Sequence, residues 1–247
     1  MATTTTTLCF DFGNTRLKCA VFVRHQLQHI AVLPTDATNA VAAIIDLLQQ
    51  YWPQYSIVSS VIHHPPEINQ LLAAHTQLHL LGHQSLLPFT APVAKPQTIG
   101  ADRLALCAAA VHLYPQHHSL VIGLGTCITY NFVNNQQQFL GGSISPGMHM
   151  RFKAMHQQTA LLPMVEAQHD FPLIGYDTKT NLQSGVLLGM AKEIDGIIDA
   201  YHQKYHRLQV LMTGGDMAFF QHHLSNRIQT DNNLLFTGLY AISLANR

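Results

Sequence analysis

Several short segments of the chain combine glycine with carboxylate, hydroxyl or basic side chains, the residue types that handle phosphate and protons. The first runs from Asp11 to Lys18 as Asp-Phe-Gly-Asn-Thr-Arg-Leu-Lys. Turn amides freed by Gly13 can enclose a phosphate, and Asn14 and Thr15 add side-chain donors. Asp11 could hold Mg²⁺ directly or through water, which phosphoryl transfer from ATP requires. The alternative is an ordinary hairpin turn without a ligand, since neither a Walker sequence nor a GxGxxG fingerprint is present.

A second segment, Gly-Ala-Asp-Arg at 100–103, precedes an apolar run with helical spacing. Asp102 at the start of a helix is typical of a cap, and the same carboxylate can also act as a general base. Arg103 beside it could bind a carboxylate with two parallel hydrogen bonds.

Two further glycine-rich segments lie in the second half of the chain. Gly125-Thr126 is followed by Gly-Gly-Ser-Ile-Ser-Pro-Gly at 141–147, whose glycines allow close backbone approach to a ligand or form a bulge and a turn. Thr-Gly-Gly-Asp at 213–216 leaves room for a flat ring such as adenine, or is simply a tight turn.

The elements that must position these segments alternate between strands and helices, which predicts an α/β fold. Strands are expected at 8–12, 17–23, 57–62, 78–81, 120–124, 128–133, 138–144 and 208–212. Helices are expected at 39–51, 67–75, 102–113, 148–162, 182–205, 217–223 and 234–246. The segments at 9–15 and 121–126 have the same shape, with Asp11 matching Gly123 and Gly13 matching Gly125, so two half-domains of similar topology are predicted.

Composition narrows the classes of function. Lys+Arg and Asp+Glu number 13 each, and charged residues make up only 11% of the chain, against about 25% in an average soluble protein. No basic surface is therefore expected for nucleic acid, and no apolar run is long enough for a membrane span. The cysteines are far apart without CxxC spacing, which together with the absence of a signal-peptide pattern predicts a cytoplasmic protein with reduced thiols.

Taken together, the motifs resemble those of type III pantothenate kinases, from about residue 8 to 240. They occur in that family's order: Asp11-x-Gly-Asn-Thr-x-x-Lys18, Gly100-Ala101-Asp102-Arg103, Gly125-Thr-x-x-Thr129, Gly141-Gly-x-Ile-x-Pro-Gly147, Thr178 before Gln183-Ser-Gly185, and Thr213-Gly-Gly-Asp216. The resemblance implies two duplicated ribonuclease-H-like α/β half-domains of the actin and acetate-kinase type, with the nucleotide in the cleft between them. We expect residues 1–116 to form the half with the phosphate-binding hairpin and substrate helix, and 117–247 the half with the second nucleotide-binding hairpin.

The same resemblance implies the roles of individual residues. Asp102 would accept the proton of the substrate hydroxyl, and Asp11 would hold Mg²⁺ through ATP. Pantothenate would be bound by Gly100, Ala101, Asp102, Arg103 and Thr178. ATP would be bound by Asp11, Phe12, Gly13, Asn14, Thr15, Arg16, Leu17, Lys18 and Thr126. The implied assembly is a homodimer.

Three positions depart from the family's pattern. Gly123 stands where the family has an Asp that binds a monovalent cation, Asn131 replaces a second Asp, and Val93 replaces a Tyr near the pantothenate site. Activation by K⁺ is therefore doubtful, while Asp11 and Asp102 are retained.

The leading hypothesis is ATP-dependent phosphorylation of pantothenate to 4'-phosphopantothenate, the first step of coenzyme A biosynthesis. One alternative is a degenerate homologue that binds nucleotide or pantothenate and regulates another process. The other is a different small-molecule kinase, or a phosphatase, of the same superfamily. Retention of Asp11 favours catalysis over binding alone, and retention of the segment 100–103 favours pantothenate over another substrate.

Overall fold

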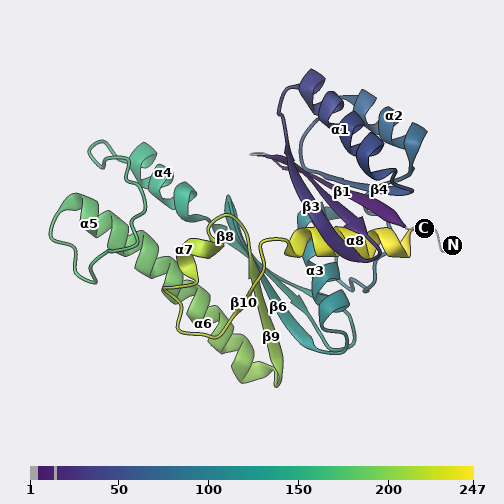
Figure 1. The fold of residues 1–247 in the computed structure, drawn as a ribbon. Helices are drawn as coiled ribbons and strands as arrows, with labels where there is room; N and C mark the ends of the chain where they lie inside the picture. Colours follow the sequence, from purple (N-terminus) through teal and green to yellow (C-terminus); the bar gives the residue numbers. More distant parts are fainter. Residues whose placement is uncertain (1–4, 14–15) are drawn as a thin grey trace. The chain divides into compact units, whose positions relative to one another are not determined.

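The computed structural model describes residues 5–13 and 16–247, which form two compact units (Figure 1). The first contains residues up to Leu113 together with Leu234–Arg247, and the second is Tyr114–Asn233. The expected halves were 1–116 and 117–247; in the structure the last helix lies in the first unit rather than in the second.

The first unit is built on a five-stranded sheet of order β3-β2-β1-β4-β5. β1 and β2 form an antiparallel hairpin. β1 also pairs in parallel with β4, which the chain reaches through a crossover connection. Its strands are β1 (Thr6–Phe12), β2 (Leu17–Val23), β3 (Gln26–Leu33), β4 (Tyr55–Ser60) and β5 (Gln77–Leu80). Its helices are α1 (Ala37–Tyr51), α2 (Pro66–His75), α3 (Ala101–Leu113) and α8 (Leu234–Ala245), with a short 3₁₀ turn at Pro96–Thr98.

Side chains alternate across this sheet and pack on different helices. Leu8, Phe10 and Phe12 of β1 join a buried cluster with α1 and α2 on one face. Helices α3 and α8 contact each other and the sheet strands β1 and β4. Their packing is close: a Cβ at Gly238 of α8 would lie 1.7 Å from the Ala105 carbonyl oxygen of α3. An apolar helix such as α8 must bury its surface, and it does so here on α3, which explains why the chain's end returns to the first unit.

The second unit repeats this topology. Its five-stranded sheet has the order β10-β9-β6-β7-β8, so β6 to β10 correspond to β1 to β5. The strands are β6 (His118–Leu124), β7 (Cys127–Val133), β8 (Phe139–Pro146), β9 (Leu208–Thr213) and β10 (Gln229–Thr230). The helices are α4 (Met148–Gln158), α5 (Thr178–Gln183), α6 (Gly189–Lys204) and α7 (Met217–Phe220), with a π-helical turn at Ser184–Leu188 joining α5 to α6. The predicted duplication is confirmed by this shared strand order.

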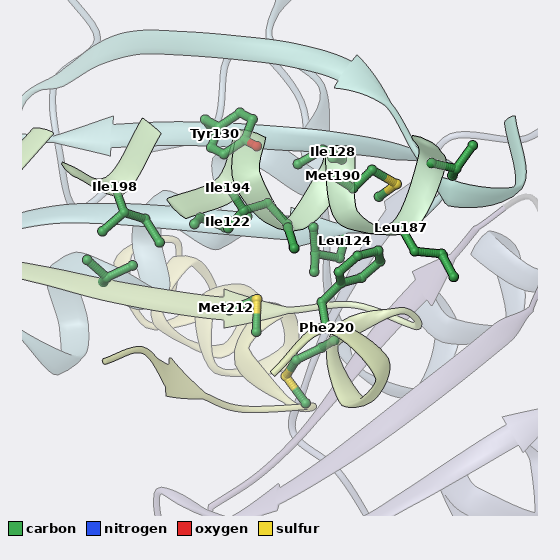
Figure 2. Packing of buried hydrophobic residues seen from close by; sticks show 14 of the residues in the cluster. Ile122, Leu124, Ile128, Tyr130, Leu187, Met190, Ile194, Ile198, Met212 and Phe220 are labelled. Carbon is green, nitrogen blue, oxygen red and sulfur yellow. The ribbon is translucent and has the colours of Figure 1, made fainter. Parts of the chain in front are cut away.

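Figure 2 shows the core that holds the second unit together. Ile122 and Leu124 of β6 lie beneath Met190 and Ile194 of α6, and the ring of Phe220 from α7 lies beside Leu124. Each fully buried side chain of this kind contributes roughly 1.5–3 kcal/mol of transfer free energy. The carboxyl end of β6, where the second glycine hairpin begins, is therefore fixed by a continuous apolar layer.

Two strands were not predicted from the sequence. β3 is an edge strand whose residues are mostly exposed or half-buried, so it lacks the apolar alternation that identifies a strand. β10 contains only Gln229 and Thr230, both exposed. Within the described ranges, no helix is long and apolar enough to cross a membrane.

Candidate active site

The β1–β2 hairpin positions the first predicted phosphate-binding segment. Gly13 closes the hairpin with a hydrogen bond from its amide to the Arg16 carbonyl at 3.2 Å. The side chains of Phe12 and Leu17 are buried in the core, so these residues can offer only backbone groups to ATP. Arg16 is exposed. The predicted donors Asn14 and Thr15 lie outside the described residues.

Asp11 is placed one residue before the end of β1, opposite Lys18 of β2. Burial raises the pKa of Asp11 to about 6, the charge of Lys18 lowers it, and the charge of Asp102 raises it. Asp11 is therefore paired with Lys18 within the hairpin, and its pKa responds to the charge of Asp102, which is far away in sequence. The charge of Lys18 lowers the pKa of Asp11 by less than burial raises it. A further positive charge beside Asp11 would therefore stabilise the ionised carboxylate.

Asp102 lies in the first turn of α3, and the Leu104 amide bonds to the Gly100 carbonyl at 3.1 Å to begin the helix. The Asp102 side chain is half-buried and turns back toward Gly100, two residues earlier. A Cβ at Gly100 would lie 2.5 Å from the Asp102 Oδ1 atom. The carboxylate can occupy this position because glycine has no side chain. Arg103 follows it, half-buried, on the same helical turn.

We expect Gly100→Ala to reduce activity far more than stability. The added methyl group meets the tip of a flexible side chain rather than backbone, so the fold can adjust while the Asp102 carboxylate is displaced. A displaced base loses alignment with its proton, and we expect kcat to fall about 10-fold or more. Thermal denaturation and initial rates, measured on the variant and on the unmodified protein, check this. A variant with normal kcat would show that the contact does not fix the base.

Thr126 lies exposed in the second hairpin, between β6 and β7. The Gly125 amide bonds to the Cys127 carbonyl at 3.1 Å, and the Gly147 amide bonds to the Thr126 carbonyl at 3.1 Å. A Cβ at Gly147 would lie 2.2 Å from the Gly125 carbonyl oxygen, which only glycine avoids. The predicted glycine segment 141–147 therefore packs its last residue directly against the Thr126 hairpin.

A polar network holds that glycine segment in place. Arg151 of α4 donates from Nε to the Pro146 carbonyl at 2.8 Å and from a terminal nitrogen to Ser145 Oγ at 2.9 Å. The same guanidinium forms an ion pair with Glu193 of α6, which also accepts a hydrogen bond from the buried Tyr130 hydroxyl at 3.2 Å. Strands β7 and β8 are thus tied to two helices next to the second hairpin.

Thr178, the predicted pantothenate ligand in the second unit, is the exposed first residue of α5. Asp177 caps this helix by accepting a hydrogen bond from the Thr180 amide at 2.7 Å. Hydrogen bonds from Thr180 lower the pKa of Asp177, which keeps the cap ionised. The cap fixes the backbone at Thr178 and leaves its hydroxyl free of the cap's hydrogen bonds.

The donor set fits a metal held mainly by a nucleotide. Within the described residues, no group of at least three His, Cys, Asp or Glu side chains could hold a metal ion by itself. Asp11 offers a half-buried carboxylate whose charge is disfavoured by burial, so a cation beside it is stabilising. Mg²⁺ commonly binds one or two carboxylates and completes its shell with phosphate oxygens and water. Asp11 is therefore suited to Mg²⁺ that arrives with ATP.

The departures at Gly123 and Asn131 lie in the sheet of the second unit. Gly123 lies in β6 and pairs with Thr129 of β7 on one side and with Thr213 of β9 on the other. Asp11 has the corresponding place in β1 of the first unit. Asn131 is fully buried and donates to the Val121 carbonyl and to Thr129 Oγ1, both at 3.2 Å. The side-chain amide of Asn131 therefore stabilises the sheet through these hydrogen bonds.

Asp216 received no role from the sequence beyond its place in a glycine turn. Its amide bonds to the Leu124 carbonyl at 3.3 Å, so the segment 213–216 lies against the end of β6. Burial raises the pKa of Asp216 and His149 partly offsets this. The equivalence of β9 and β4 could have indicated the importance of this position, because both strands end beside a glycine hairpin.

The two five-stranded sheets share one strand order, which defines a duplicated, actin-like α/β fold. A solved structure with this fold is a glucokinase from an Antarctic psychrotroph, with a TM-score of 0.54 and 11% identity, covering 97% of this chain and 98% of that chain. At this identity the likeness concerns the fold alone.

The model of the type III pantothenate kinase family matches residues 7–200. A type III pantothenate kinase of Flavobacterium johnsoniae is 36% identical over 236 residues, covering 94% of this chain and 95% of the relative. Another, from Christiangramia forsetii, is 38% identical over 235 residues with the same coverage. The chain belongs to the type III pantothenate kinase family.

Proposed function

We propose that this protein phosphorylates pantothenate at the expense of ATP, giving 4'-phosphopantothenate and ADP, the first step of coenzyme A biosynthesis. What supports this is the match to the kinase family, together with Asp11 at the end of β1 and Asp102 at the start of α3, whose charge raises the pKa of Asp11. One carboxylate is suited to the metal end of ATP and the other to the hydroxyl of the acceptor. A non-catalytic binder would have no need to keep both.

The proposed chemistry assigns each group one task. The primary hydroxyl oxygen of pantothenate attacks the γ-phosphorus, the bond from that phosphorus to the β–γ bridging oxygen breaks, and Asp102 accepts the hydroxyl proton. Mg²⁺, when bound with ATP, neutralises the phosphate oxygens. Hairpin amides beside Gly13, together with Lys18 and Thr126, orient the phosphates, and Arg103 with Thr178 orients pantothenate. Little covalent work is left to the protein, because positioning and charge neutralisation supply most of the acceleration.

The assembly and location of the protein follow from the same proposal. We propose a homodimer in the cytoplasm, with pantothenate and ATP as its ligands and no nucleic acid or membrane partner. Cys9, Cys19 and Cys107 are buried free thiols, which suits a reducing compartment. Size-exclusion chromatography with light scattering measures the assembly, and a monomer would remove the dimer from this account.

Purified protein with ATP and Mg²⁺ tests the function directly. We expect ADP release that depends on pantothenate and on Mg²⁺, and release without pantothenate at no more than a background rate. Glucose and acetate serve as alternative acceptors, because other enzymes of this superfamily phosphorylate sugars and acids. Faster ADP release with one of them than with pantothenate would contradict the proposed substrate.

The response to K⁺ is a separate prediction. Gly123 offers only backbone groups, and a weakly hydrated cation that loses a charged ligand is harder to desolvate. We therefore expect substantial activity without K⁺ and at most about twofold activation by KCl at constant ionic strength. Gly123 has the extended backbone of β6, so Gly123→Asp is compatible with the strand and is expected to create K⁺ dependence. Strong activation of the unmodified protein would show that other oxygens complete the site.

A further inference from the structure

We propose that Ser59 is a positioning residue for Asp11: its hydroxyl bonds to the Asp11 carboxylate when the metal–nucleotide complex is bound, leaving the other carboxylate oxygen to face the metal. This inference rests on the proposed function of Asp11 and assigns a role to a residue that no motif singled out. Ser59 follows the apolar core of β4, one residue before the strand ends.

The strand register places Ser59 beside Asp11. In the parallel pairing of β1 with β4, Asp11 is opposite Ser59, and in the antiparallel pairing with β2 it is opposite Lys18. Asp11 therefore lies on a central strand with the lysine on one side and the serine on the other. Neighbouring strands are about 4.8 Å apart, so a hydroxyl at this position can reach the carboxylate by rotation of a side chain.

Alternation along the strands indicates that both side chains share one face of the sheet. Phe10 and Phe12 of β1 and Val58 of β4 belong to the cluster under α1 and α2. Because side chains alternate, Asp11 and Ser59 point to the opposite face, the one that α3 and α8 contact. Asp102 begins α3. Ser59 thus belongs to the same face as both carboxylates of the site.

The Ser59 hydroxyl is a buried polar group without a partner. Ser59 is 1% exposed, and among the residues that the structure describes its Oγ has no hydrogen-bond partner. Burying an unpaired hydroxyl is unfavourable, so such a group needs a reason. Its neighbour Ser60 differs: that hydroxyl donates to the Ile62 carbonyl at 2.8 Å and lies 3.1 Å from His64 Nδ1. A bond to Asp11 in the bound state would satisfy Ser59.

The second unit provides a matched control. Ser119 of β6 is also 1% exposed, and its Oγ also has no partner among the described residues. It lies near the start of β6, opposite Val133 and Gln209, away from the glycine hairpin that follows the strand. Removal of either hydroxyl should leave the ligand-free protein equally or more stable, because neither makes a hydrogen bond there.

The test compares Ser59→Ala, Ser59→Cys and Ser119→Ala with the unmodified protein. Two readouts are used: the thermal shift produced by Mg²⁺ with ADP, which needs no turnover, and the KM for Mg²⁺-ATP. We expect Ser59→Ala to melt no lower than the unmodified protein without ligand, to lose most of the thermal shift, and to raise the KM about tenfold. Ser59→Cys fills the same space with a poor donor and should behave as Ser59→Ala does, while Ser119→Ala should match the unmodified protein.

Two results would overturn the proposal. One is a Ser59→Ala variant with the normal thermal shift and normal KM. The other is a Ser59→Ala variant that melts lower without ligand and is rescued in both readouts by Ser59→Cys, which would assign Ser59 to packing. Absence of turnover in the unmodified protein would contradict the proposed kinase function, and the thermal shift would still decide the role of Ser59.

Discussion

We expect Asp102→Asn to reduce kcat by roughly 100-fold or more, because the amide keeps the shape of the carboxylate but cannot accept the hydroxyl proton. Asp102 is the second residue of α3 rather than its N-cap, so α3 should still begin at Ala101 and the fold should be unchanged. Nucleotide affinity should survive, since Asp102 is assigned to pantothenate. Steady-state kinetics and the thermal shift with Mg²⁺-ADP separate these effects.

Asp36→Asn is the matched control for this substitution. Asp36 caps α1 in the same unit by accepting the Asn39 amide at 3.0 Å, and it lies outside the site. The same chemical change at another helix start should leave kcat unaltered. A nearly normal rate in Asp102→Asn would remove this residue from the mechanism, and an equal loss in both variants would assign it to stability.

Asp11→Asn and Asp11→Ala are expected to abolish Mg²⁺-dependent turnover while raising the stability of the fold at neutral pH. Burial raises the pKa of Asp11 from 3.8 to about 6, so the folded protein binds more protons than the unfolded chain between these values. The free energy of unfolding therefore falls as pH rises from about 4 to 6. Removing the charge should add on the order of 3 kcal/mol at pH 7 and little at pH 4.

Thermal denaturation of Asp11→Asn at both pH values measures this effect, with Asp46→Asn as the control. Asp46 lies exposed on α1, so its replacement should change neither turnover nor the pH dependence of stability. Before metal binds to the unmodified protein, Asp11 becomes protonated as the pH falls through about 6. This protonation should weaken the binding of Mg²⁺-ATP. An Asp11→Asn variant that unfolds would support the view of this segment as a structural turn.

Most of the fold could be predicted from periodicity because its buried elements carry clear patterns. The hairpin at 8–23 and the helix that begins near Asp102 were predicted to within a residue or two. Edge strand β3 was not, since its polar residues face solvent and leave no alternation to detect. The return of α8 to the first unit was also missed, because an apolar helix does not specify which of two similar sheets it will cover.

The site could be predicted only in part, for a physical reason. Local motifs singled out Asp11, Lys18 and Asp102, and the charges of Lys18 and Asp102 both act on the pKa of Asp11. Ser59 lies near the end of β4 and Asp216 just after β9, and the neighbours of both strands are set by parallel pairing across a crossover. Such pairing depends on the register of distant strands, which no local pattern in one sequence encodes.

Mass spectrometry of the product formed from pantothenate, ATP and Mg²⁺ tests the central claim most directly. The account predicts one phosphorylated pantothenate for each ADP released, with the phosphate on the primary hydroxyl, and loss of both products in Asp102→Asn. Nucleotide binding without phosphorylated pantothenate at any KCl concentration would contradict it and would favour the non-catalytic binder.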